Sequence, residues 1–469
     1  MGSEWPLVKL GDYCCKIGSG ATPKGGSSVY LDSGDVCLIR SQNIYNEGFD
    51  EGGLVYIDEI AATKLRNVVV EHNDILLNIT GDSVARVCLV PDAYLPARVN
   101  QHVAIIRPNV KHFDARFLRY FLASSKTQIL LLNLSSAGAT RNALTKSMIE
   151  NFEVPKPSLD VQAFIANILQ SLDNKIMKNR KINQTLDQMA QTLFKSWFVD
   201  FDPVVDNALD AGFFEQDLAF SEELLRRVKL RKAVRERDDF KPLSNDVRQL
   251  FPDAFVESAQ SALGLGGWVP KGWNNGCISD VAHYRTKRIN TSELTLTNYI
   301  STENMLVDRK GIQQATALPT VNSVPAYTFG TILISNIRPY FKKIWLAKGD
   351  GGYSNDVLGF EVKDQGTEEY LFNLMYQDSF FDFMMATSKG SKMPRGDKKA
   401  ILGLELVVPP LKLRKLFSKN VNSFYTSSNT RNDENFTLGQ LRDTLLPKLI
   451  SGELSLSDIK IDNPEETLI

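Results

Sequence analysis

The sequence repeats itself once, and this repeat constrains the fold more than any other feature. Residues 75–81 (ILLNITG) and 332–338 (ILISNIR) are both apolar runs that end in a polar turn. A second apolar run follows each of them, at residues 100–106 and 354–360. The period is about half of the chain, which is too long for a solenoid with its repeats of roughly 20–50 residues. The sequence therefore predicts a duplicated domain.

Further pairs of segments follow one another in the same order in the two halves. Pro155 and Pro409 close a short strand in each half and are 254 positions apart, and the offset stays close to this value from the middle of each half onward. The other pairs are the openings at Trp5 and Trp273, the amphipathic helices at 117–122 and 370–375, and the loops at 135–141 and 389–395. Agreement in both order and spacing supports the duplication.

After each of these prolines the pattern becomes helical, with steps of three and four residues that are typical of a coiled-coil seam. The first seam comprises Ile165, Ile168, Leu172, Lys175, Asn179, Ile182, Leu186, Met189 and Leu193. The second comprises Phe417, Val421, Phe424, Ser428, Arg431, Asn435, Leu438, Leu441 and Leu445. They fit either two helices on separate cores or one antiparallel coiled coil. Because both seams are polar in the middle, we favour antiparallel packing, with Asn179 and Arg431 near the crossing and fixing the register.

We therefore expect an α+β chain with a pseudo-twofold internal duplication. Two similar mixed α/β domains, each a small sheet plus helices, are joined by two long helices packed as an antiparallel coiled coil. About 36 residues per helix would form a rod of about 54 Å. The expected boundaries are 1–157 (first domain), 158–204 (first helix), 205–267 (connector), 268–410 (second domain), 411–456 (second helix) and 457–469 (tail).

The connector contains a charged helix. Its basic residues are interleaved with acids, which is typical of a solvated helix face, although a phosphate or subunit contact is the alternative. The basic residues are Arg226, Arg227, Lys229, Arg231, Lys232, Arg235 and Arg237. Residues 263–267 (LGLGG) then predict a flexible connection into the second half.

Motifs for catalysis or metal binding are lacking. The five cysteines form no C-x-x-C pair and the four histidines are scattered, so we expect reduced thiols and no metal. Residues 18–22 (GSGAT) lack the third glycine of a dinucleotide loop and the ending of a P-loop. Residues 408–411 (VPPL) have the prolines of a base-methyltransferase motif but not its polar or aromatic residue, and Asp200 and Asp202 have no accompanying ligand set. We predict no catalytic residue.

The N-terminus has no signal-peptide pattern and no apolar run approaches the ~20 residues needed to span a bilayer, so a cytoplasmic location is expected.

The paired segments carry loop residues of the kinds that read base edges in duplex DNA. In the first half these are Arg40, Ser41, Gln42, Asn43, Thr80, Arg86, Arg98, Asn100, Gln101 and Arg141. In the second they are Ser335, Asn336, Arg338, Tyr340, Lys342, Lys343, Asn355, Lys392 and Arg395. A shared frame with different loop residues would suit two different half-sites.

Three segments resemble a known family. Residues 192–204 (TLFKSWFVDFDPV) look like the central conserved region of the specificity subunit of type I restriction–modification systems. Residues 250–255 (LFPDAF) with 270–273 (PKGW) are similar to the start of that family's second target-recognition domain, and residues 441–454 (LRDTLLPKLISGEL) to its distal conserved region. The order of these segments spans nearly the whole chain.

The resemblance implies two target-recognition domains, each reading one part of a split, asymmetric sequence in double-stranded DNA. The helices would set the gap between the parts and dock two modification subunits, which carry S-adenosylmethionine and methylate adenine. Restriction subunits would add ATP- and Mg-dependent translocation and cleavage, so no cofactor belongs to this chain. A rod of about 54 Å could hold two modules about one turn of B-DNA (roughly 34 Å) apart.

The helix ends have two interpretations, because apolar residues gather there: Phe194, Trp197, Phe198, Phe201, Leu445 and Leu446. They either close the coiled-coil end or dock a modification subunit, as the enrichment of aromatic residues in interfaces suggests. The net charge of -1 predicts weak DNA binding by the chain alone. The alternatives are a self-contained DNA enzyme, a scaffold that does not read DNA, and a specificity subunit without a restriction partner.

Overall fold

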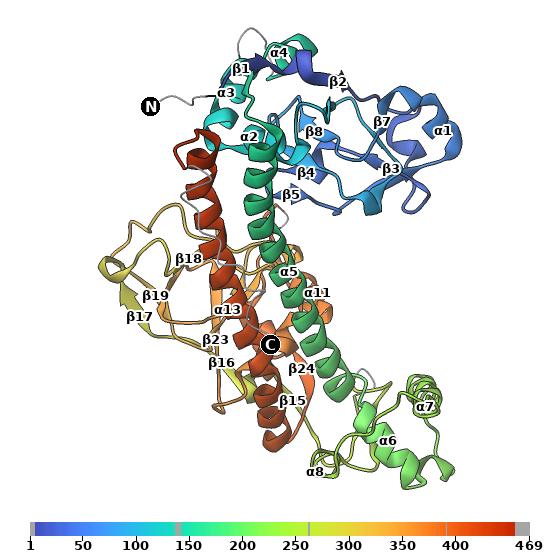
Figure 1. The fold of residues 1–469 in the computed structure, drawn as a ribbon. Helices are drawn as coiled ribbons and strands as arrows, with labels where there is room; N and C mark the ends of the chain where they lie inside the picture. Colours follow the sequence, from blue (N-terminus) through green and yellow to red (C-terminus); the bar gives the residue numbers. More distant parts are fainter. Residues whose placement is uncertain (1–4, 137–141, 261–262, 391, 455–469) are drawn as a thin grey trace, which may run out of the picture. The chain divides into compact units, whose positions relative to one another are not determined.

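The computed structural model describes residues 5–136, 142–260, 263–390 and 392–454 (Figure 1). It divides into two compact units, one formed by Met1–Lys181 with Arg431–Ile469 and the other by Ile182–Thr430. Each unit combines one mixed α/β domain with parts of two long helices. The predicted α+β duplication with two long helices is therefore confirmed.

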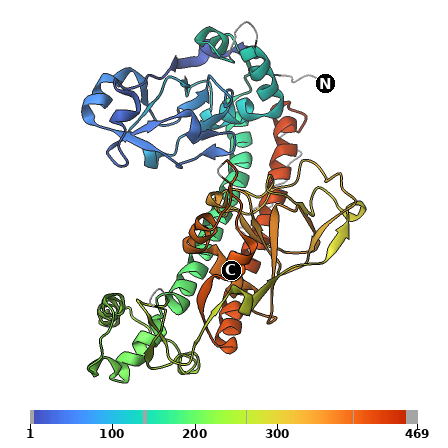
Figure 2. The same cartoon turned by 180° about the vertical axis from the view of Figure 1, so that it is seen from behind.

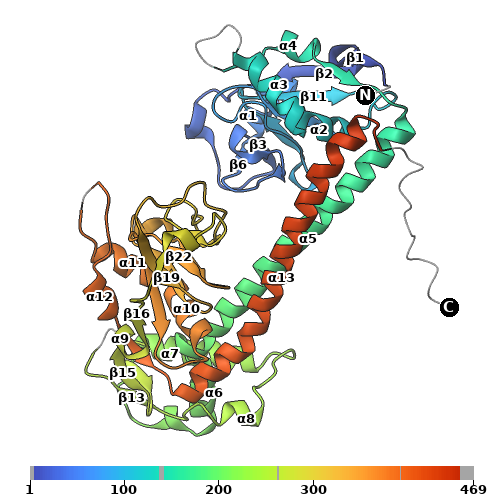
Figure 3. The ribbon, with the colours of Figure 1, turned by 90° about the vertical axis from the view of Figure 1, so that its left-hand side faces the viewer.

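The two long helices are α5 (Leu159–Phe198) and α13 (Leu411–Ile450), each 40 residues long (Figure 3). In the first unit, Ile165 near the start of α5 shares a core with Leu449 near the end of α13. In the second unit, Phe194 near the end of α5 shares a core with Phe417 near the start of α13. Within each unit, the half of one helix thus packs against the opposite half of the other, which confirms the antiparallel arrangement.

The first domain has two four-stranded sheets. One has the strand order β2 (Cys14–Ser19), β11 (Val103–Pro108), β8 (Ile75–Asn78), β9 (Val87–Leu89), and the other β6 (Val55–Ile57), β3 (Val36–Ile39), β10 (Ala97–Val99), β7 (Val69–Val70). The remaining elements are β1 (Leu7–Lys9), β4 (Ile44–Tyr45), β5 (Gly48–Phe49), β12 (Glu153–Pro155), α1 (Glu59–Lys64), α2 (Ala115–Ala123), α3 (Ser125–Ser136) and α4 (Lys146–Glu150). All four residues of β8 are buried because Ile75 and Leu77 pack toward the helices, while Leu76 packs toward the second sheet.

The second domain repeats this architecture (Figure 2). One sheet has the order β16 (Ala282–Tyr284), β23 (Val357–Val362), β20 (Ile332–Ser335), β21 (Ile344–Leu346), which matches the first domain strand for strand. The other has the order β17 (Arg288–Asn290), β19 (Ser323–Tyr327), β22 (Gly351–Tyr353), β18 (Tyr299–Ile300). The remaining elements are β15 (Asn274–Cys277), β24 (Glu405–Val408), α9 (Ile278–Val281), α10 (Glu368–Tyr376), α11 (Asp378–Ala386) and α12 (Lys398–Leu402).

The predicted seam of α5 consists of two rows of residues, each with a spacing of seven, and one row is shifted by one residue in the structure. The first row is buried or half-buried as expected, at Ile165, Leu172, Asn179 and Leu186. The second row is formed by Leu169, Ile176, Asn183 and Ala190 in place of Ile168, Lys175, Ile182 and Met189. On α13, Leu441 is 45% exposed. The prediction assumed one partner helix, whereas α5 packs on both α13 and its own domain, as Leu169 does with Phe117.

The connector is folded rather than extended. It contains α6 (Asp202–Asp210), α7 (Glu222–Arg235), α8 (Asn245–Arg248), β13 (Phe255–Glu257) and β14 (Trp268–Pro270). Residues 263–267, predicted to be a flexible connection, instead form a turn in which the backbone N–H of Gly267 donates to the carbonyl of Leu263 at 2.9 Å. Three glycines supply the positive φ angles that this turn needs, and the Leu263 side chain is buried.

Three basic residues of α7 form a ladder of ion pairs with three acidic residues of α6. Asp202, Asp206 and Asp210 recur every four residues, as do Arg227, Arg231 and Arg235. Arg227 Nε donates to Asp202 at 2.6 Å, Arg231 Nη2 donates to Asp206 at 2.5 Å, and Arg235 pairs with Asp210. These three arginines are therefore paired with α6, whereas Arg226, Lys229 and Lys232 stay exposed. Within the described residues, no helix is both long and apolar enough to cross a bilayer.

Candidate nucleic-acid interface

Strands β8 and β20 run into turns of the same hydrogen-bonded form, which we call the matched turns (residues 79–85 and 336–342). The N–H of Asn78 donates to the carbonyl of Arg86 at 2.8 Å, and the N–H of Ser335 donates to that of Lys343 at 3.1 Å. Inside the turns, Val84 donates to Gly81 at 3.1 Å and Phe341 donates to Arg338 at 3.0 Å. Every one of these pairs is related by 257 positions, as are Ile75 and Ile332.

The matched turns also share their backbone conformation at both ends. Gly81 and Ala85 have φ angles of 77° and 72°, and their counterparts Arg338 and Lys342 have φ angles of 50° and 49°. Positive φ is sterically unfavourable for residues other than glycine. The duplication has thus kept one backbone shape while its side chains have changed completely.

Each matched turn forms an isolated β-bridge with a later segment of its own domain. Thr80 forms a β-bridge with Ala143, and Ile337 forms one with Arg395. In the second domain this segment presents Lys392, which is exposed, and Arg395, which pairs with Asp356 at 3.1 Å. In the first domain, Arg141 lies outside the described residues.

In the first domain, His102 joins the side chains of Thr80 and Gln101. Thr80 Oγ1 lies 2.6 Å from His102 Nδ1, and Gln101 Nε2 lies 2.8 Å from His102 Nε2. With the Gln101 amide donating to Nε2, Nδ1 carries the ring proton and donates to Thr80. Thr22 in turn bonds to Gln101. Sequence reasoning missed His102, although it directly follows two of the predicted readers.

Several other predicted readers are part of the frame. Asn43 is fully buried and donates to the carbonyls of Asp50 and Gly52 at 2.9 and 3.2 Å. Asn100 is 7% exposed and accepts from the N–H of His102. Arg40 and exposed Gln42 both donate to the carbonyl of Gly53, and Arg98 donates to that of Ala62. The backbone carbonyl of Ser41 accepts from Asn78. Ser335 and Asn336 are buried, and Ser335 donates to the carbonyl of Ile337 at 3.1 Å. These contacts engage part of the predicted set within its own domain.

The exposed side chains of the second domain gather at its matched turn. Arg338 is exposed, Tyr340 is 48% exposed, and Asn355 is exposed beside them in the chain segment that precedes β23. Lys342 Nζ donates to Asp378 at 2.6 Å, and Lys343 Nζ donates to the carbonyl of Thr302 at 2.7 Å. In the first domain, the guanidinium of Arg86 stacks 4.7 Å from the ring centre of Tyr45.

Asp378 fixes two cations of the second domain. Hydrogen bonds from Arg309 and then from Lys342 lower the pKa of the Asp378 carboxyl to about 2. The pKa of Lys343 is lowered from its usual value, mainly because burial disfavours its charged form. Arg338 and Lys392 are thus better suited than Lys342 and Lys343 to meet a polyanion.

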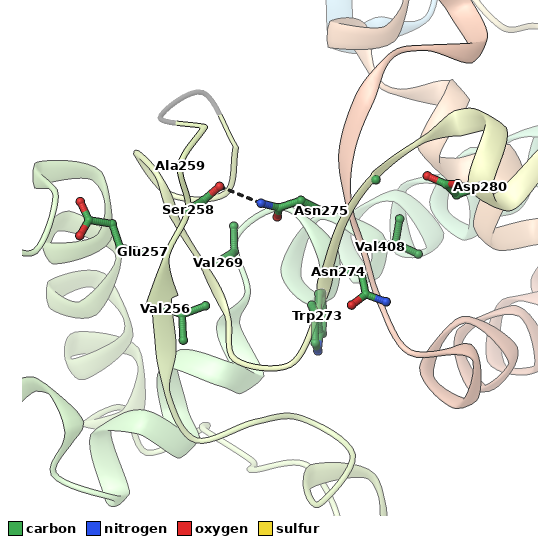
Figure 4. A pocket seen from close by; sticks show the side chains of 11 residues that line it. Val256, Glu257, Ser258, Ala259, Val269, Trp273, Asn274, Asn275, Asp280 and Val408 are labelled. Carbon is green, nitrogen blue, oxygen red and sulfur yellow. Dashed lines mark hydrogen bonds between the residues drawn. The ribbon is translucent and has the colours of Figure 1, made fainter.

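A pocket elsewhere in the second unit has the wrong chemistry for DNA. It lies between β13, β14 and β15, and Figure 4 shows Trp273, Asn274 and Asn275 along it. Its charged residues are Glu257 and Asp280, both acidic, and the Asn275 amide is already bonded to Ser258 Oγ at 2.9 Å. Carboxylates repel phosphate, so we do not assign nucleic acid to this pocket.

In each unit, a three-way polar junction ties the domain to both long helices. In the first unit, Asp173 on α5 accepts from Tyr120 on α2 at 2.7 Å and from Arg442 on α13 at 2.9 Å. In the second unit, Asn373 on α10 donates to Tyr425 on α13 at 2.9 Å and accepts from Gln191 on α5 at 2.6 Å.

The two junctions occupy equivalent positions. Tyr120 and Asn373 are 253 positions apart, Asp173 and Tyr425 are 252 apart, and Gln191 and Arg442 are 251 apart. One junction is charged and the other is neutral, although the duplication puts them at the same places. The residue types alone did not reveal this pairing.

The residue expected to set the helix register makes two bonds to α13. Asn179 Nδ2 donates to Glu434 at 2.7 Å and to Asn435 at 3.0 Å. The pKa of Glu434 is lowered, first by the bond from Asn179 and also by the nearby charge of Arg431. Arg431 itself is half-buried, one helical turn before these partners of Asn179.

The apolar helix ends are buried within the chain. Phe194, Trp197, Phe198 and Phe201 are 1%, 3%, 8% and 2% exposed in the core of the second unit. Leu446 is buried and Leu445 is half-buried in the core of the first unit. A partner subunit would have no access to the four aromatic rings, so burial favours the interpretation that they close the helix end.

The cysteines are unpaired and mostly shielded. Burial raises the pKa of the Cys14 and Cys88 thiols to about 12, which makes them poor nucleophiles and poor metal ligands. Cys37 is buried, Cys277 is half-buried and Cys15 is exposed. Over the part of the chain that the structure describes, no cluster of three or more His, Cys, Asp or Glu residues could hold a metal ion.

The known proteins to which this chain is similar are of one kind. Residues 2–188 match the family model described as Type I restriction modification DNA specificity domain. The Type I restriction enzyme HindI specificity subunit of Haemophilus influenzae is 24% identical over 96% of this chain and 100% of its own length. The MjaIX specificity subunit of Methanocaldococcus jannaschii is 23% identical over 97% of this chain and 95% of its own.

A solved structure has the same fold. The crystal structure of the type I restriction-modification S subunit from M. genitalium aligns with a TM-score of 0.52 at 14% identity, covering 95% of this chain and 96% of that one. The resemblance drawn from residues 192–204, 250–273 and 441–454 is therefore confirmed.

Proposed function

We propose that this chain, a relative of the specificity subunits of type I restriction–modification systems, is the DNA-reading subunit of such a complex. Each target-recognition domain reads one part of a split sequence. The observation that carries this proposal is the pair of matched turns: one backbone shape bears Gly81, Asp82 and Ser83 in one domain and Arg338, Pro339 and Tyr340 in the other. A constant frame with different exposed groups suits two half-sites of different sequence.

We keep part of the predicted set as candidate readers, including Arg141, which lies outside the described residues. The retained residues are Thr80, Arg86, Gln101, Arg141, Arg338, Tyr340, Asn355, Lys392 and Arg395. We assign them to domains spanning 1–157 and 268–410. The conserved helices at 158–204 and 411–456 set the spacer, and the connector at 205–267 supports the second domain.

The chemistry resides in partner subunits of a cytoplasmic complex. Two modification subunits carry S-adenosylmethionine and methylate adenine, and restriction subunits carry ATP and Mg. Support comes from the relatives, which are named as specificity subunits of restriction enzymes. This chain supplies the sequence information and the platform.

The test is methylome sequencing of cells that express this chain with its modification subunit. We expect methylated adenines in one split motif with a fixed gap of unspecified bases. As a control, cells expressing the modification subunit alone should show no such motif. A soluble complex that leaves the genome unmethylated and binds no DNA sequence selectively would contradict the proposal.

The modification subunits should dock on exposed faces of the long helices rather than on the buried aromatic cluster. Phe436 on α13 is 66% exposed, although aromatic side chains are usually buried or held in interfaces. Phe436→Ser should weaken binding of the modification subunit by about tenfold or more, as expected for an aromatic anchor. Titration of the labelled modification subunit measures this.

The matched control is Val110→Ser, because Val110 is 71% exposed and belongs to the first domain rather than to α13. It should leave the affinity unchanged. Equal affinity for the Phe436→Ser and Val110→Ser proteins would rule out Phe436 as an anchor.

A further inference from the structure

The two matched turns differ most at one position. Ser83 in the first turn corresponds to Tyr340 in the second, 257 positions later. The Tyr340 ring is 48% exposed, and its centre lies 4.6 Å from that of Phe341, which packs at a tilt against it. An aromatic ring therefore stands out from the second domain where the first has only a hydroxymethyl group.

The backbone that carries Tyr340 is held in an unusual conformation. Arg338 and Lys342, on either side of the short 3₁₀ helix Pro339–Phe341, both have positive φ. The neighbouring Asp308 and Arg309 do too, at 54° and 61°. These four are more than half of the seven non-glycine residues with positive φ in the described chain. Such strain persists where the surrounding structure over-determines it, often at functional sites.

Several bonds lock the two strained segments together. The N–H of Asp308 donates to the carbonyl of Phe341 at 2.9 Å, and that of Arg309 donates to the carbonyl of Lys342 at 3.0 Å. Asp378 at the start of α11 then binds the side chains of both Arg309 and Lys342. Tyr340 thus projects from a fixed platform, which would lose little freedom on binding.

Within the described residues, two exposed cations of this region make no side-chain hydrogen bond or ion pair: Arg338 on the turn that carries the ring, and Lys392 on the loop bonded to that turn. Arg338, two residues before Tyr340, is exposed, and its N–H donates to the carbonyl of Pro394 at 2.9 Å, which fixes the adjacent loop. That loop presents exposed Lys392 and, next to it, Met393 at 48% exposure. The two bonded segments thus offer an exposed aromatic ring, an exposed thioether and two cations, which are groups suited to stacked bases and their phosphates.

We propose that Tyr340 inserts between two adjacent base pairs in the half-site read by the second domain, unstacking that step and kinking the duplex. This inference rests on the proposed function and deepens it. A side chain that wedges between two base pairs adds sequence specificity, because base steps differ in how easily they are unstacked and kinked. Ser83 is too short to wedge, so the first domain reads its half-site without this distortion.

The test uses the complex of the full chain with its modification subunits on the duplex identified by methylation. 2-Aminopurine replaces single bases across the second half-site, except the methylated adenine, because its fluorescence rises when stacking is lost. At one base step, 2-aminopurine fluorescence should rise with the wild-type complex and with Tyr340→Phe, but not with Tyr340→Ala. Tyr340→Ala should also weaken binding about 5- to 100-fold.

The control is Phe329→Ala. Phe329 is 74% exposed but precedes β20, whereas Tyr340 follows it. This variant should brighten the same step as the wild type. Two results would overturn the wedge but not the proposed function. One is sequence-selective binding without any rise in 2-aminopurine fluorescence, and the other is the same rise with Tyr340→Ala as with the wild type. Loss of the modification subunit from Tyr340→Ala would assign the ring to a protein contact and overturn it too. A wild-type complex that binds no sequence selectively would overturn both the wedge and the proposed function.

Discussion

Replacing Trp197 by alanine should destabilise the second unit by about 3–5 kcal/mol, the range for removing a large buried aromatic side chain. The ring is 3% exposed, and its centre lies 5.2 Å from that of Phe251 and 6.2 Å from that of Phe417. It therefore joins the end of α5, the start of α13 and the connector. None of these neighbours can fill the cavity without leaving its own position.

Hydrogen exchange followed by mass spectrometry measures this effect unit by unit, which matters because a chain with two units need not unfold in one step. Protection should fall across Ile182–Thr430. Met189→Ala is the matched control on the same helix, since Met189 is 48% exposed and should change stability by less than about 0.5 kcal/mol. Unchanged protection together with lost binding of the modification subunit would restore the docking interpretation.

Replacing Asp173 by alanine should cost the first unit about 3–5 kcal/mol, because it removes the acceptor from a buried charge network. The Asp173 side chain is 12% exposed and meets Arg119 at 3.3 Å and Arg442 at 2.9 Å. Arg119 is only 8% exposed, so its guanidinium would be left buried with one fewer partner. Tyr120 would lose its acceptor as well.

A double-mutant cycle with Arg442→Gln separates the ion pair from the rest of the network. The singly and doubly substituted proteins should show coupling well above that of Lys175 and Glu434, an exposed pair 3.3 Å apart on the same two helices. That pair should contribute less than about 1 kcal/mol. Similar coupling for the two pairs, measured by chemical unfolding, would show that Asp173 does not hold α13 to the first domain.

The architecture could be predicted because the duplication left paired segments in a constant order. The polar middle of both seams also indicated antiparallel helices, and Asn179 does bond across to α13. The second row of the α5 seam was displaced by one residue because a heptad pattern assumes one partner. Leu169 and Ala190 are fully buried, and periodicity alone does not distinguish a helix with two partners from a helix with one.

The reading residues were harder to predict because the same residue types read bases and build turns. Asn43 and Asn100 are amides in loops, as a base reader would be, yet both hold the backbone of their own turns. Only the fold shows that Arg338 and Tyr340 stand on a turn equivalent to that of Gly81 and Ser83. The ladder between α6 and α7 did have a sequence signal, namely three acids and three arginines at the same four-residue spacing.

The division of both long helices between the units has a consequence for synthesis. The second unit is one uninterrupted stretch, Ile182–Thr430, so all of it is synthesised before the part of α13 that follows Thr430. The first unit begins the chain but needs Arg431–Ile469 to finish its core, where Leu446 and Leu449 pack against Ile165. Contacts so distant in sequence form slowly. Of these two units, the one whose synthesis starts earlier is thus completed later, and a nascent chain that stops before α13 ends leaves the start of α5 without its apolar partner.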